Sequence, residues 1–231
     1  MQYLLPQIRN DIPAISAATM MINPCTALRM LLDFVPLAPG DWVIQNGANS
    51  GVGQAVIQIA KTMGVKTVNV VRDREGIEQM KQKLTNMGGT IILTEEELRA
   101  TQMWKAGEVA RPVLGFNCVG GASSTEICKA LADKGVHVTY GGMSRKPVMA
   151  ATSHMIFKDL ELRGFWMGQW NERQGRNKAR MDMYNHITQL VHMGQLDPTD
   201  HQLVTLDRYR EALDNTLKGF LPAKYVFKID F

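Results

Sequence analysis

A glycine-rich turn between an apolar run and an amphipathic segment constrains this chain more than any other feature. The turn reads Gly47-Ala48-Asn49-Ser50-Gly51-Val52-Gly53. It follows an apolar run at 42–46 that predicts a buried strand, and it opens a helix expected over 51–63. Glycines allow a close backbone approach, and a helix start offers N–H groups and a positive dipole end. This order predicts a loop that binds the pyrophosphate of a dinucleotide, although a plain strand-to-helix turn is the alternative.

The first two thirds of the chain repeat this alternation of strand and helix. Apolar, β-branched runs predict strands and the segments between them predict helices: strands at 66–71, 90–93, 113–119 and 136–140, and helices at 75–87, 94–104 and 123–132. Thr94 and Glu97 have the spacing of a capping box that begins the helix at 94–104. An earlier helix is expected to begin at Asn23, with Asn23 as its N-cap and Pro24 in its first turn. The pattern predicts an α/β fold with a doubly wound, Rossmann-type parallel sheet.

After Phe165 the alternation stops. A basic, polar stretch at 171–180 leads into a helix that we expect to pass through Tyr184 and Val191. A short strand, a helix and a last strand are then expected at 202–205, 207–217 and 225–229. These pieces do not extend the βα repeat. They are typical of part of a second domain whose remainder is absent.

The end of the second strand bears on the kind of dinucleotide. A site for NAD places an Asp or Glu there, because that carboxylate accepts a hydrogen bond from the ribose 2′-OH. Here Arg72 takes the first position after the strand and Arg74 lies two residues on. Two guanidinium groups can hold a 2′-phosphate through charge-assisted hydrogen bonds, which favours NADPH over NADH. Asp73 argues against this interpretation unless it pairs with an arginine, and a solvated charge cluster is the alternative.

Two further glycine pairs follow predicted strands, in Cys118-Val119-Gly120-Gly121 and in Tyr140-Gly141-Gly142-Met143. Open α/β sheets bind ligands at the carboxyl ends of their strands. Backbone at these turns is therefore placed to contact a nicotinamide ribose or amide. Either pair is equally consistent with a turn that begins a helix.

Charge and composition exclude several classes of protein. The chain has 26 Lys and Arg against 22 Asp and Glu, a small and scattered excess that does not indicate nucleic-acid binding but suits an anionic small molecule. No apolar run approaches the ~18 residues of a membrane-spanning helix. Cys25, Cys118 and Cys128 follow no metal-ligand spacing, so we expect buried thiols and no metal site.

Six segments carry a resemblance to a known family. They are residues 23–27, 46–53, 69–74, 117–121, 138–143 and 157–166, and the likeness runs in order from about Asp11 to Lys224. Together they resemble the mitochondrial 2-enoyl thioester reductases of the medium-chain dehydrogenase/reductase superfamily. The resemblance implies NADPH-dependent reduction of trans-2-enoyl-CoA or enoyl-acyl-carrier-protein in mitochondrial fatty acid synthesis. It also implies a homodimer that joins the edges of two sheets, with 136–140 or a nearby strand at the edge.

The same resemblance implies a cofactor site, carried over motif by motif. It assigns Asn23 to the nicotinamide or to support of the substrate site. It assigns the pyrophosphate to Asn49, Ser50, Gly51 and Val52, and the 2′-phosphate end of the adenosine to Arg72, Asp73 and Arg74. The nicotinamide falls to Tyr140, Gly141, Gly142 and Met143 and to Phe165, Trp166 and Met167, and Lys224 completes the set.

The departure from the family concerns the start of the chain. The family's enzymes have an N-terminal GroES-like domain that supplies a tyrosine proton donor and much of the acyl pocket. This chain begins where that domain is ending, and Tyr3 does not stand in the donor's sequence context. We therefore expect a truncated form with no catalytic residue of its own, which binds NADPH weakly and reduces enoyl thioesters poorly.

The resemblance also sets the expected domains and location. Residues 1–22 end the catalytic domain or form a linker, 23–165 form the dinucleotide-binding domain, and 166–231 are the C-terminal remnant of the GroES-like domain. A transit peptide would lie in the missing part. The expected location is mitochondrial by family, and cytoplasmic if Met1 is the true start.

Two other functions compete with reductase activity. The segment Leu28-Arg29-Met30-Leu31-Leu32 has the Leu-x-x-Leu-Leu spacing of helices that dock into nuclear-receptor grooves, which would suit a non-catalytic NADPH-binding or receptor-binding form. The same spacing occurs in any buried amphipathic helix, and we favour core packing. A quinone-reductase-like oxidoreductase would share the glycine turn and the arginines, but residues 23–26 and 165–166 argue against it.

Overall fold

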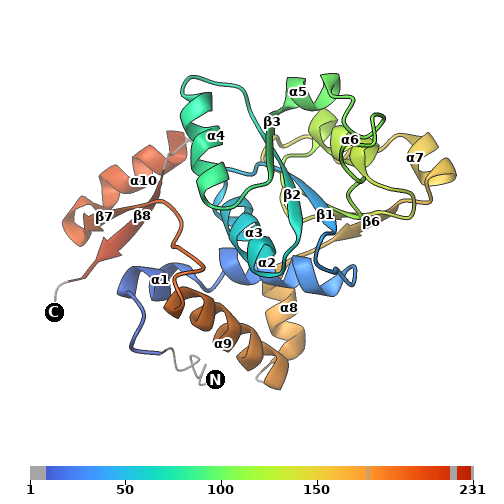
Figure 1. Ribbon diagram of the computed structural model, residues 1–231. Coiled ribbons are helices and arrows are strands. Elements are labelled where there is room, and N and C mark those ends of the chain that lie inside the picture. The colour runs from blue at the N-terminus through green and yellow to red at the C-terminus, as the bar shows by residue number, and fades with distance from the viewer. Residues whose placement is uncertain (1–8, 176, 219–222, 230–231) are drawn as a thin grey trace.

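The computed structural model describes residues 9–175, 177–218 and 223–229. Within them, a six-stranded sheet has the order β3-β2-β1-β4-β5-β6, and every neighbouring pair is parallel (Figure 1). The strands are β1 (Trp42–Asn46), β2 (Lys66–Val71), β3 (Ile91–Thr94), β4 (Leu114–Asn117), β5 (Val136–Thr139) and β6 (Glu161–Gly164). The chain winds outward from β1 in one direction and from β4 in the other. The predicted doubly wound sheet is therefore confirmed.

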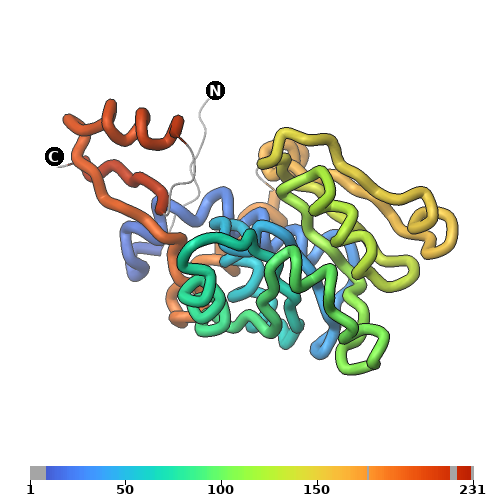
Figure 2. Tube along the Cα trace, turned by 90° about the horizontal axis from the view of Figure 1, so that it is seen from above, coloured from blue at the N-terminus to red at the C-terminus, as the bar shows by residue number. Residues whose placement is uncertain are grey.

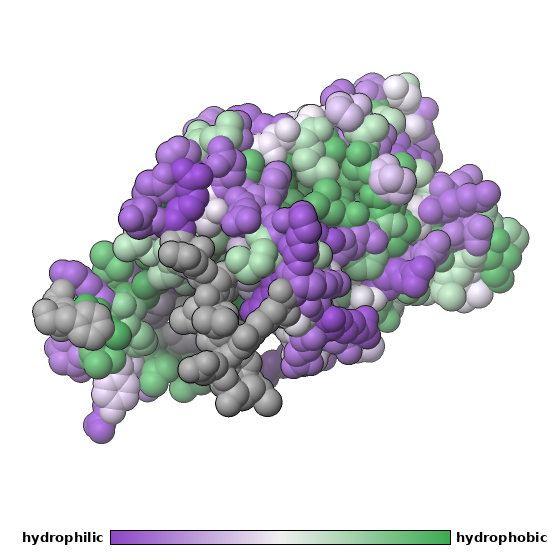
Figure 3. Space-filling model, turned by 90° about the horizontal axis from the view of Figure 1, so that it is seen from below, coloured by the Kyte–Doolittle hydropathy of each residue, from purple (hydrophilic) through white to green (hydrophobic). Residues whose placement is uncertain are grey.

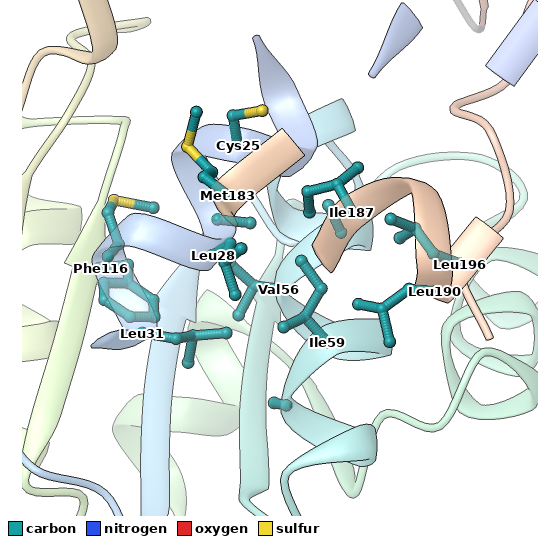
Figure 4. Close-up of a cluster of buried hydrophobic side chains, with 14 of the residues drawn as sticks. Cys25, Leu28, Leu31, Val56, Ile59, Phe116, Met183, Ile187, Leu190 and Leu196 are labelled. Atoms are coloured by element: carbon teal, nitrogen blue, oxygen red, sulfur yellow. The ribbon is translucent and has the colours of Figure 1, made fainter. Parts of the chain in front are cut away.

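Helices cover both faces of this sheet. On one face lie α2 (Asn23–Asp33), α3 (Gly51–Thr62) and α9 (Lys178–His192), and on the other lie α5 (Glu95–Ala100) and α6 (Gly121–Ala130). Adjacent residues of β1 point to opposite faces, so Val43 packs with the first group and Ile44 with the second. Figure 4 shows how side chains of α2, α3 and α9 meet in the first core.

Helix α2 settles two predictions. Leu28 and Leu31 of the Leu-x-x-Leu-Leu segment are buried in the core, as favoured, while Leu32 is 49% exposed. The prediction that Asn23 caps this helix is wrong, because Ile22 is the N-cap and its carbonyl accepts from the N–H of Thr26 at 2.8 Å. Asn23 is instead the first helical residue, and its side chain lies against Gly51.

The capping box predicted for the helix after β3 is confirmed. Thr94 accepts from the backbone N–H of Glu97 at 3.1 Å, and the Glu97 carboxylate accepts from the N–H of Thr94 at 2.6 Å. Helix α4 (Ile77–Asn86) lies within the predicted range 75–87. Local side-chain chemistry therefore sets the start of α5, and Lys81 of α4 also pairs with the Glu97 carboxylate at 2.7 Å.

Several elements follow the end of β5 without having been predicted. They are α7 (Thr152–Phe157), β6 and α8 (Met167–Gln174), and α1 (Ala14–Thr19) was also missed near the N-terminus. Strand β6 is exposed at every position because it forms the sheet edge, and α8 buries only Met167. Neither has the apolar periodicity by which buried elements are found. Strand β5 lies between β4 and β6, so the edge is β6 rather than 136–140.

The predicted C-terminal pieces form a small unit of their own. Its elements are β7 (His201–Thr205), a short 3₁₀ helix η1 (Leu206–Arg208), α10 (Tyr209–Lys218) and β8 (Lys224–Lys228). Strands β7 and β8 pair in parallel as a separate two-stranded sheet. Figures 1 and 2 show this unit at the opposite end of the molecule from α7.

Hydrogen bonds tie this C-terminal unit to the larger domain just before β7. The N–H of Asp197 donates to the side chain of Gln58 at 2.8 Å, and Gln54 donates to Asp200 at 3.4 Å. Asp200 also forms an ion pair with Lys83 of α4. These contacts hold the connection between the two units against α3.

The remaining sequence expectations concern thiols, membranes and the N-terminal segment. Cys25, Cys118 and Cys128 are buried and unpaired, as expected. Across residues 9–175, 177–218 and 223–229, no helix combines the length and apolarity needed to cross a bilayer. Tyr3 and the first eight residues of the predicted segment 1–22 lie outside the described residues.

His137 is a buried titratable group in the middle of β5. Its side chain is 0% exposed, and neither ring nitrogen has a hydrogen-bond partner among the described residues. Burial lowers the pKa of His137 from 6.5 to about 4, because charging the ring there would leave it unsolvated. The folded protein therefore holds a neutral histidine where the unfolded chain holds one that accepts a proton below about pH 6.5.

We expect stability to fall as the pH drops from about 6.5 toward 4, since the unfolded state then binds a proton that the folded state excludes. The His137 contribution lost between about pH 7 and pH 5 is about 2 kcal/mol. Urea unfolding of the wild type and of His137→Leu at both pH values measures it, with the variant showing the flatter dependence. Exposed His186→Gln is the control. An equal pH dependence in the wild type and His137→Leu would refute the assignment.

Candidate functional site

A cleft of about 860 Å³ lies at the carboxyl ends of the central strands. Its lining comes from the glycine turn after β1, the ends of β2 and β4, the turn after β5, and the C-terminal unit. The winding of the sheet reverses between β1 and β4. Ligands of open α/β sheets bind at this switch point, so the cleft stands where the sheet topology predicts a site.

The glycine turn is held in a shape that only glycine fits. Gly47 has φ +59°, and a Cβ there would lie 2.5 Å from the Cys118 sulfur. A Cβ on Gly53 would lie 2.5 Å from the carbonyl oxygen of Ala48. Ser50 caps α3 by accepting from the N–H of Gly53 at 3.1 Å. The first turn of α3 is thus fixed at the cleft wall with its positive dipole end toward the cavity.

Buried amide side chains support the switch point from below. Asn46 ends β1 and donates to the side chain of Asn117, which ends β4, at 2.8 Å. The Asn46 oxygen accepts from the N–H of Cys118 at 2.8 Å, and the Asn117 oxygen accepts from the N–H of Gly120 at 3.0 Å. These bonds fix the two turns relative to each other. Neither asparagine role was predicted from the sequence, where the only signal is a polar residue that ends each of two apolar strands.

A second buried pair fixes the start of α3 from the strand side. Gln45 donates to the carbonyl of Gly53 at 2.9 Å and to the side chain of Asn69 at 2.8 Å. Both side chains are fully buried. The Gln45 nitrogen is satisfied by these two bonds, while its buried oxygen has no partner among the described residues. The two bonds favour one arrangement of β1, β2 and α3, because a buried donor without them would be costly.

The charge lining the cleft is predominantly basic. Among the described residues that line it, the basic side chains are Arg72, Arg74, Arg145, Lys218 and Lys224, and the acidic ones are Glu95 and Asp200. Asp200 already pairs with Lys83. Arg72 and Arg74 leave the end of β2, while Lys218 and Lys224 come from the opposite wall. The cleft is therefore suited to an anionic ligand with charges at several points.

A buried thiol and a buried hydroxyl lie beneath the glycine turn. The Tyr140 hydroxyl is buried, and Cys118 and Ser50 are its neighbours. Burial raises the pKa of Tyr140 well above its ordinary value of 10.0, and Cys118 adds to the rise. Burial likewise raises the pKa of Cys118 above 9.0. Both groups stay protonated near neutral pH, so neither adds negative charge under the cleft.

The structure brings together part of the set predicted by resemblance. The predicted residues that line the cleft are Asn49, Ser50, Gly51, Arg72, Arg74, Met143 and Lys224. Those outside its lining are Asn23, Val52, Asp73, Tyr140, Gly141, Gly142, Phe165, Trp166 and Met167. Asn23 still lies next to the site, because its side-chain nitrogen contacts the position of Gly51.

The predicted segment 165–167 adopts three different environments. Phe165 packs edge-on against Phe34 with ring centroids 6.0 Å apart. Trp166 is 66% exposed and is the N-cap of α8. Met167 is buried in the core beside α2 and α9. A contact from Met167 to a ligand would therefore have to come from its backbone.

The two glycine pairs also differ from each other. Gly120 is the N-cap of α6 and Gly121 its first residue, so the alternative reading of that pair as a helix-starting turn is confirmed. Gly141 packs against Cys118, while a Cβ on Gly142 would meet nothing within 4 Å. The second pair does not begin a helix.

The connection before β7 adds residues to the cleft that the sequence did not predict. Thr199 and Asp200 line it, and Thr199 lies beside Gly51. Their neighbour Gln54 also donates to the carbonyl of Asn49 at 3.0 Å, which links the connection to the glycine turn. Gln54 and Asp200 are 146 positions apart in the chain. No local pattern signals such a contact.

The wall formed by the C-terminal unit is apolar as well as basic. Leu213, Leu217 and Phe227 line the cleft and remain exposed, Leu217 by 85%. Figure 3 shows hydrophobic surface at this end of the molecule and again at the α7 end. Among the described residues, no group of three or more His, Cys, Asp or Glu is placed to hold a metal ion.

Comparisons with known proteins bear on this site. A family described as zinc-binding dehydrogenases matches residues 51–181, which is more than half of the 231 residues. The mitochondrial enoyl-[acyl-carrier-protein] reductase of Homo sapiens is 47% identical over 223 residues, covering 96% of this chain and 60% of that protein. The protein of the same name from Arabidopsis thaliana is 42% identical and covers 91% and 56%. The chain spans about 60% of the length of the human relative.

Solved structures agree with the relatives. The complex of Etr1p with NADP and crotonyl-CoA has a TM-score of 0.87 at 29% identity, covering 97% of this chain and 66% of that chain. The mitochondrial 2-enoyl thioester reductase Etr1p/Etr2p heterodimer from Candida tropicalis has a TM-score of 0.84 at 30% identity, covering 93% and 65%. A protein from Bacillus thuringiensis named as an NADPH:quinone reductase has a TM-score of 0.79 at 20% identity, which shows the fold alone.

These likenesses confirm the resemblance to the mitochondrial 2-enoyl thioester reductases. The cleft lies where that resemblance predicted a dinucleotide site. The chain belongs to the zinc-binding dehydrogenase family, within the medium-chain dehydrogenase/reductase superfamily.

Proposed function

We propose that this chain is the NADPH-binding part of a mitochondrial reductase of trans-2-enoyl thioesters. The observation that carries the proposal is the basic, glycine-walled cleft at the switch point, with Arg72 and Arg74 at the end of β2. Relatives 42–47% identical bear the name of mitochondrial enoyl-[acyl-carrier-protein] reductase, which supports the substrate class and the location. The similar Etr1p complex contains NADP and crotonyl-CoA.

The residues present fit such a cofactor. The close-packed glycine turn and the first turn of α3 suit a pyrophosphate, with Asn49, Ser50 and Gly51 at the cleft wall. Arg72 and Arg74 suit the 2′-phosphate, and we assign Asp73, which stands outside the cleft lining, to the same end of the cofactor. The two arginines add positive charge beside the pyrophosphate site, which suits a dinucleotide with an additional phosphate, such as NADPH.

The other end of the cofactor falls to the turn after β5. We assign the nicotinamide to the stretch from Tyr140 to Met143 and to the neighbouring segment 165–167, with Asn23 beside Gly51. Val52, in the first turn of α3, is assigned to the pyrophosphate. Only Met143 of the first stretch lines the cleft. Lys224 reaches the cleft from β8 and completes the set from the C-terminal side.

The proposed chemistry is a hydride transfer followed by protonation. When bound, NADPH supplies the hydride that adds to the β-carbon of the enoyl thioester. The residues of this chain bind and orient the cofactor, and the basic wall holds its charges. The proton for the α-carbon comes from the part of the relatives' length that this chain does not span. The Tyr140 hydroxyl is not placed to donate it, because it is buried outside the cleft lining.

We propose that residues 23–165 bind the dinucleotide and that 166–231 return from it to a catalytic domain, which segment 1–22 also joins. Helix α9 still packs on the six-stranded sheet, so the part that leaves the dinucleotide-binding domain is the unit from β7 to β8. The support is the separate β7–β8 sheet and the exposed Leu206 and Tyr209 at the start of the C-terminal helical segment, which lie outside the cleft lining. An amphipathic helix that leaves large apolar residues in water is typical of a surface that another segment covers. The part of the relatives' sequence that this chain does not span would supply that segment.

The two competing functions are weaker. Docking of α2 to a receptor would need Leu28 and Leu31 exposed, yet both are buried in the core. The quinone-reductase likeness stands at 20% identity against 47% for the human enoyl reductase. Enoyl thioester reduction is thus the function that the site and its relatives support best.

Exchange of both arginines should remove the preference for the 2′-phosphate. In Arg72→Ala combined with Arg74→Ala, we expect NADPH to bind about 10- to 100-fold more weakly, because charge-assisted hydrogen bonds contribute about 1.5–3 kcal/mol. NADH binding should change little. Isothermal titration of both nucleotides measures this, with the exposed pair Lys105→Ala and Lys129→Ala as a charge-matched control. Equal losses for NADPH and NADH would contradict the assignment.

Turnover by the 231-residue chain should be slow. A missing general acid reduces rates by about 10²–10⁴-fold, so we expect crotonyl-CoA reduction to be slower by at least that factor than in the full-length human relative. NADPH oxidation at 340 nm measures both proteins under one condition. Comparable rates would show that this chain carries its own proton donor.

We further propose a homodimer that joins two sheets at β6. Strand β6 is an exposed edge, with Leu162 40% exposed. Helix α7 beside it exposes Met155, Ile156 and Phe157. Exposed edges of this kind readily pair with another strand, and the apolar helix adds area to be covered. The heterodimer of the Candida tropicalis reductase supports assembly in pairs.

Substitution of Phe157 should separate such a dimer. We expect Phe157→Lys to raise the dimer dissociation constant at least tenfold, since it places a charge in an apolar contact. Sedimentation velocity over a range of concentrations measures the change. Exposed Leu203→Lys, at the other end of the molecule, is the control. A variant that dimerises as the wild type does would exclude this surface.

A further inference from the structure

Arg145 lies in a tight turn directly after the stretch assigned to the nicotinamide. It lines the cleft, and its backbone has φ +57° although it is not glycine. Within residues 9–175, 177–218 and 223–229, its guanidinium makes no hydrogen bond or ion pair. Arginine rarely adopts this backbone conformation, and this guanidinium has no partner that would stabilise the fold. Stability of the fold therefore does not explain an arginine at this position.

The turn is held rigidly on both sides of Arg145. The N–H of Met143 donates to the carbonyl of Cys118 at 2.8 Å, and the N–H of Ser144 donates to the carbonyl of Val119 at 3.0 Å. Beyond Arg145, the carbonyl of Pro147 accepts from the N–H of Gly121 at 2.8 Å. The unusual backbone of Arg145 is therefore imposed by the turn after β4, which itself borders the cleft.

Positive φ alone does not mark a site in this protein. Lys134 and Asp159 also have positive φ, but they stand just before β5 and β6, at the amino ends of the strands. Neither lines the cleft. The N–H of Lys134 donates to the carbonyl of Lys158 at 2.6 Å, so these two residues meet in the turns between elements. Arg145 alone of the three combines this backbone with a place in the cleft.

We propose that Arg145 is a phosphate-binding residue of the cleft, which engages the diphosphate of a bound nucleotide. Arg72 and Arg74 occupy one wall and Lys218 and Lys224 another, so Arg145 adds a cation on a third side. Its planar fork matches two phosphate oxygens, and with no partner in the protein it need not break an ion pair to bind them. The proposal rests on the proposed nucleotide cleft and adds to it a residue outside the set carried over by resemblance.

Two ligands of this reaction carry a diphosphate, NADPH and the coenzyme A part of the thioester. The chemistry that Arg145 recognises is the same in both. Titration of the full chain with NADPH and separately with coenzyme A distinguishes the two sources. A loss confined to one ligand identifies whose diphosphate it holds.

The variants separate charge from backbone strain. Asn tolerates positive φ, so Arg145→Asn removes the charge and keeps the turn, while Arg145→Lys keeps a charge. We expect Arg145→Asn to weaken binding of one of the two ligands by about 5- to 20-fold, and Arg145→Lys to weaken it less, because lysine keeps the charge but not the planar fork. Thermal unfolding of each variant confirms that the turn is intact. Lys146→Gln, the adjacent cation outside the cleft lining, is the matched control.

Two results would overturn the proposal. One is Arg145→Asn binding both ligands within twofold of the wild type. The other is Lys146→Gln weakening binding as much as Arg145→Asn, which would show an effect of net charge alone. If NADPH binds and depends on Arg72 and Arg74 but not on Arg145, this inference fails and the proposed function stands. If coenzyme A binding depends on Arg145 while NADPH does not bind at all, the inference stands and the proposed cofactor fails.

Discussion

The approach of the start of α3 to the end of β1 is the contact on which the site depends. A Cβ on Gly53 would lie 2.5 Å from the Ala48 carbonyl oxygen, a distance that no side chain tolerates. With glycine there, the helix begins directly at the switch point and Ser50 closes its first turn. The cleft then receives the positive end of α3 at the point where the sheet topology opens it.

Buried amides make that arrangement specific. Hydrophobic packing would hold β1 and β4 together in several registers, since their apolar residues are interchangeable in kind. The Asn46–Asn117 and Gln45–Asn69 hydrogen bonds form in one arrangement only, and a shift of register would leave the donating nitrogens of Asn46 and Gln45 without these partners. These side chains touch the turns at Cys118 and Gly53 rather than the open cleft. They act on the site by fixing the backbone around it.

The sequence predicted what local chemistry determines. The sheet class, the glycine turn, the Thr94–Glu97 capping box and the basic end of β2 all follow from patterns a few residues long. It did not predict β6 or α8, because an exposed edge strand and a polar helix bury too little for a periodic signal. It also missed Asp200, whose place in the cleft depends on Gln54 and Lys83, far away in the chain. Asn23 is not the N-cap that the sequence predicted, because Ile22 occupies that position and Asn23 is the first helical residue.

The charge of the cleft explains why its C-terminal wall matters. Cations on one wall attract an anion but do not orient it, because a freely rotating ligand can present either end. Cations on opposing walls fix both position and direction. Lys218 and Lys224 can oppose Arg72 and Arg74 only while the connection before β7 is held against α3 by Asp200 and its neighbours. Residues 197–200 are thus part of the binding site's geometry, and an acidic side chain there is compatible with an anionic ligand because Lys83 neutralises it.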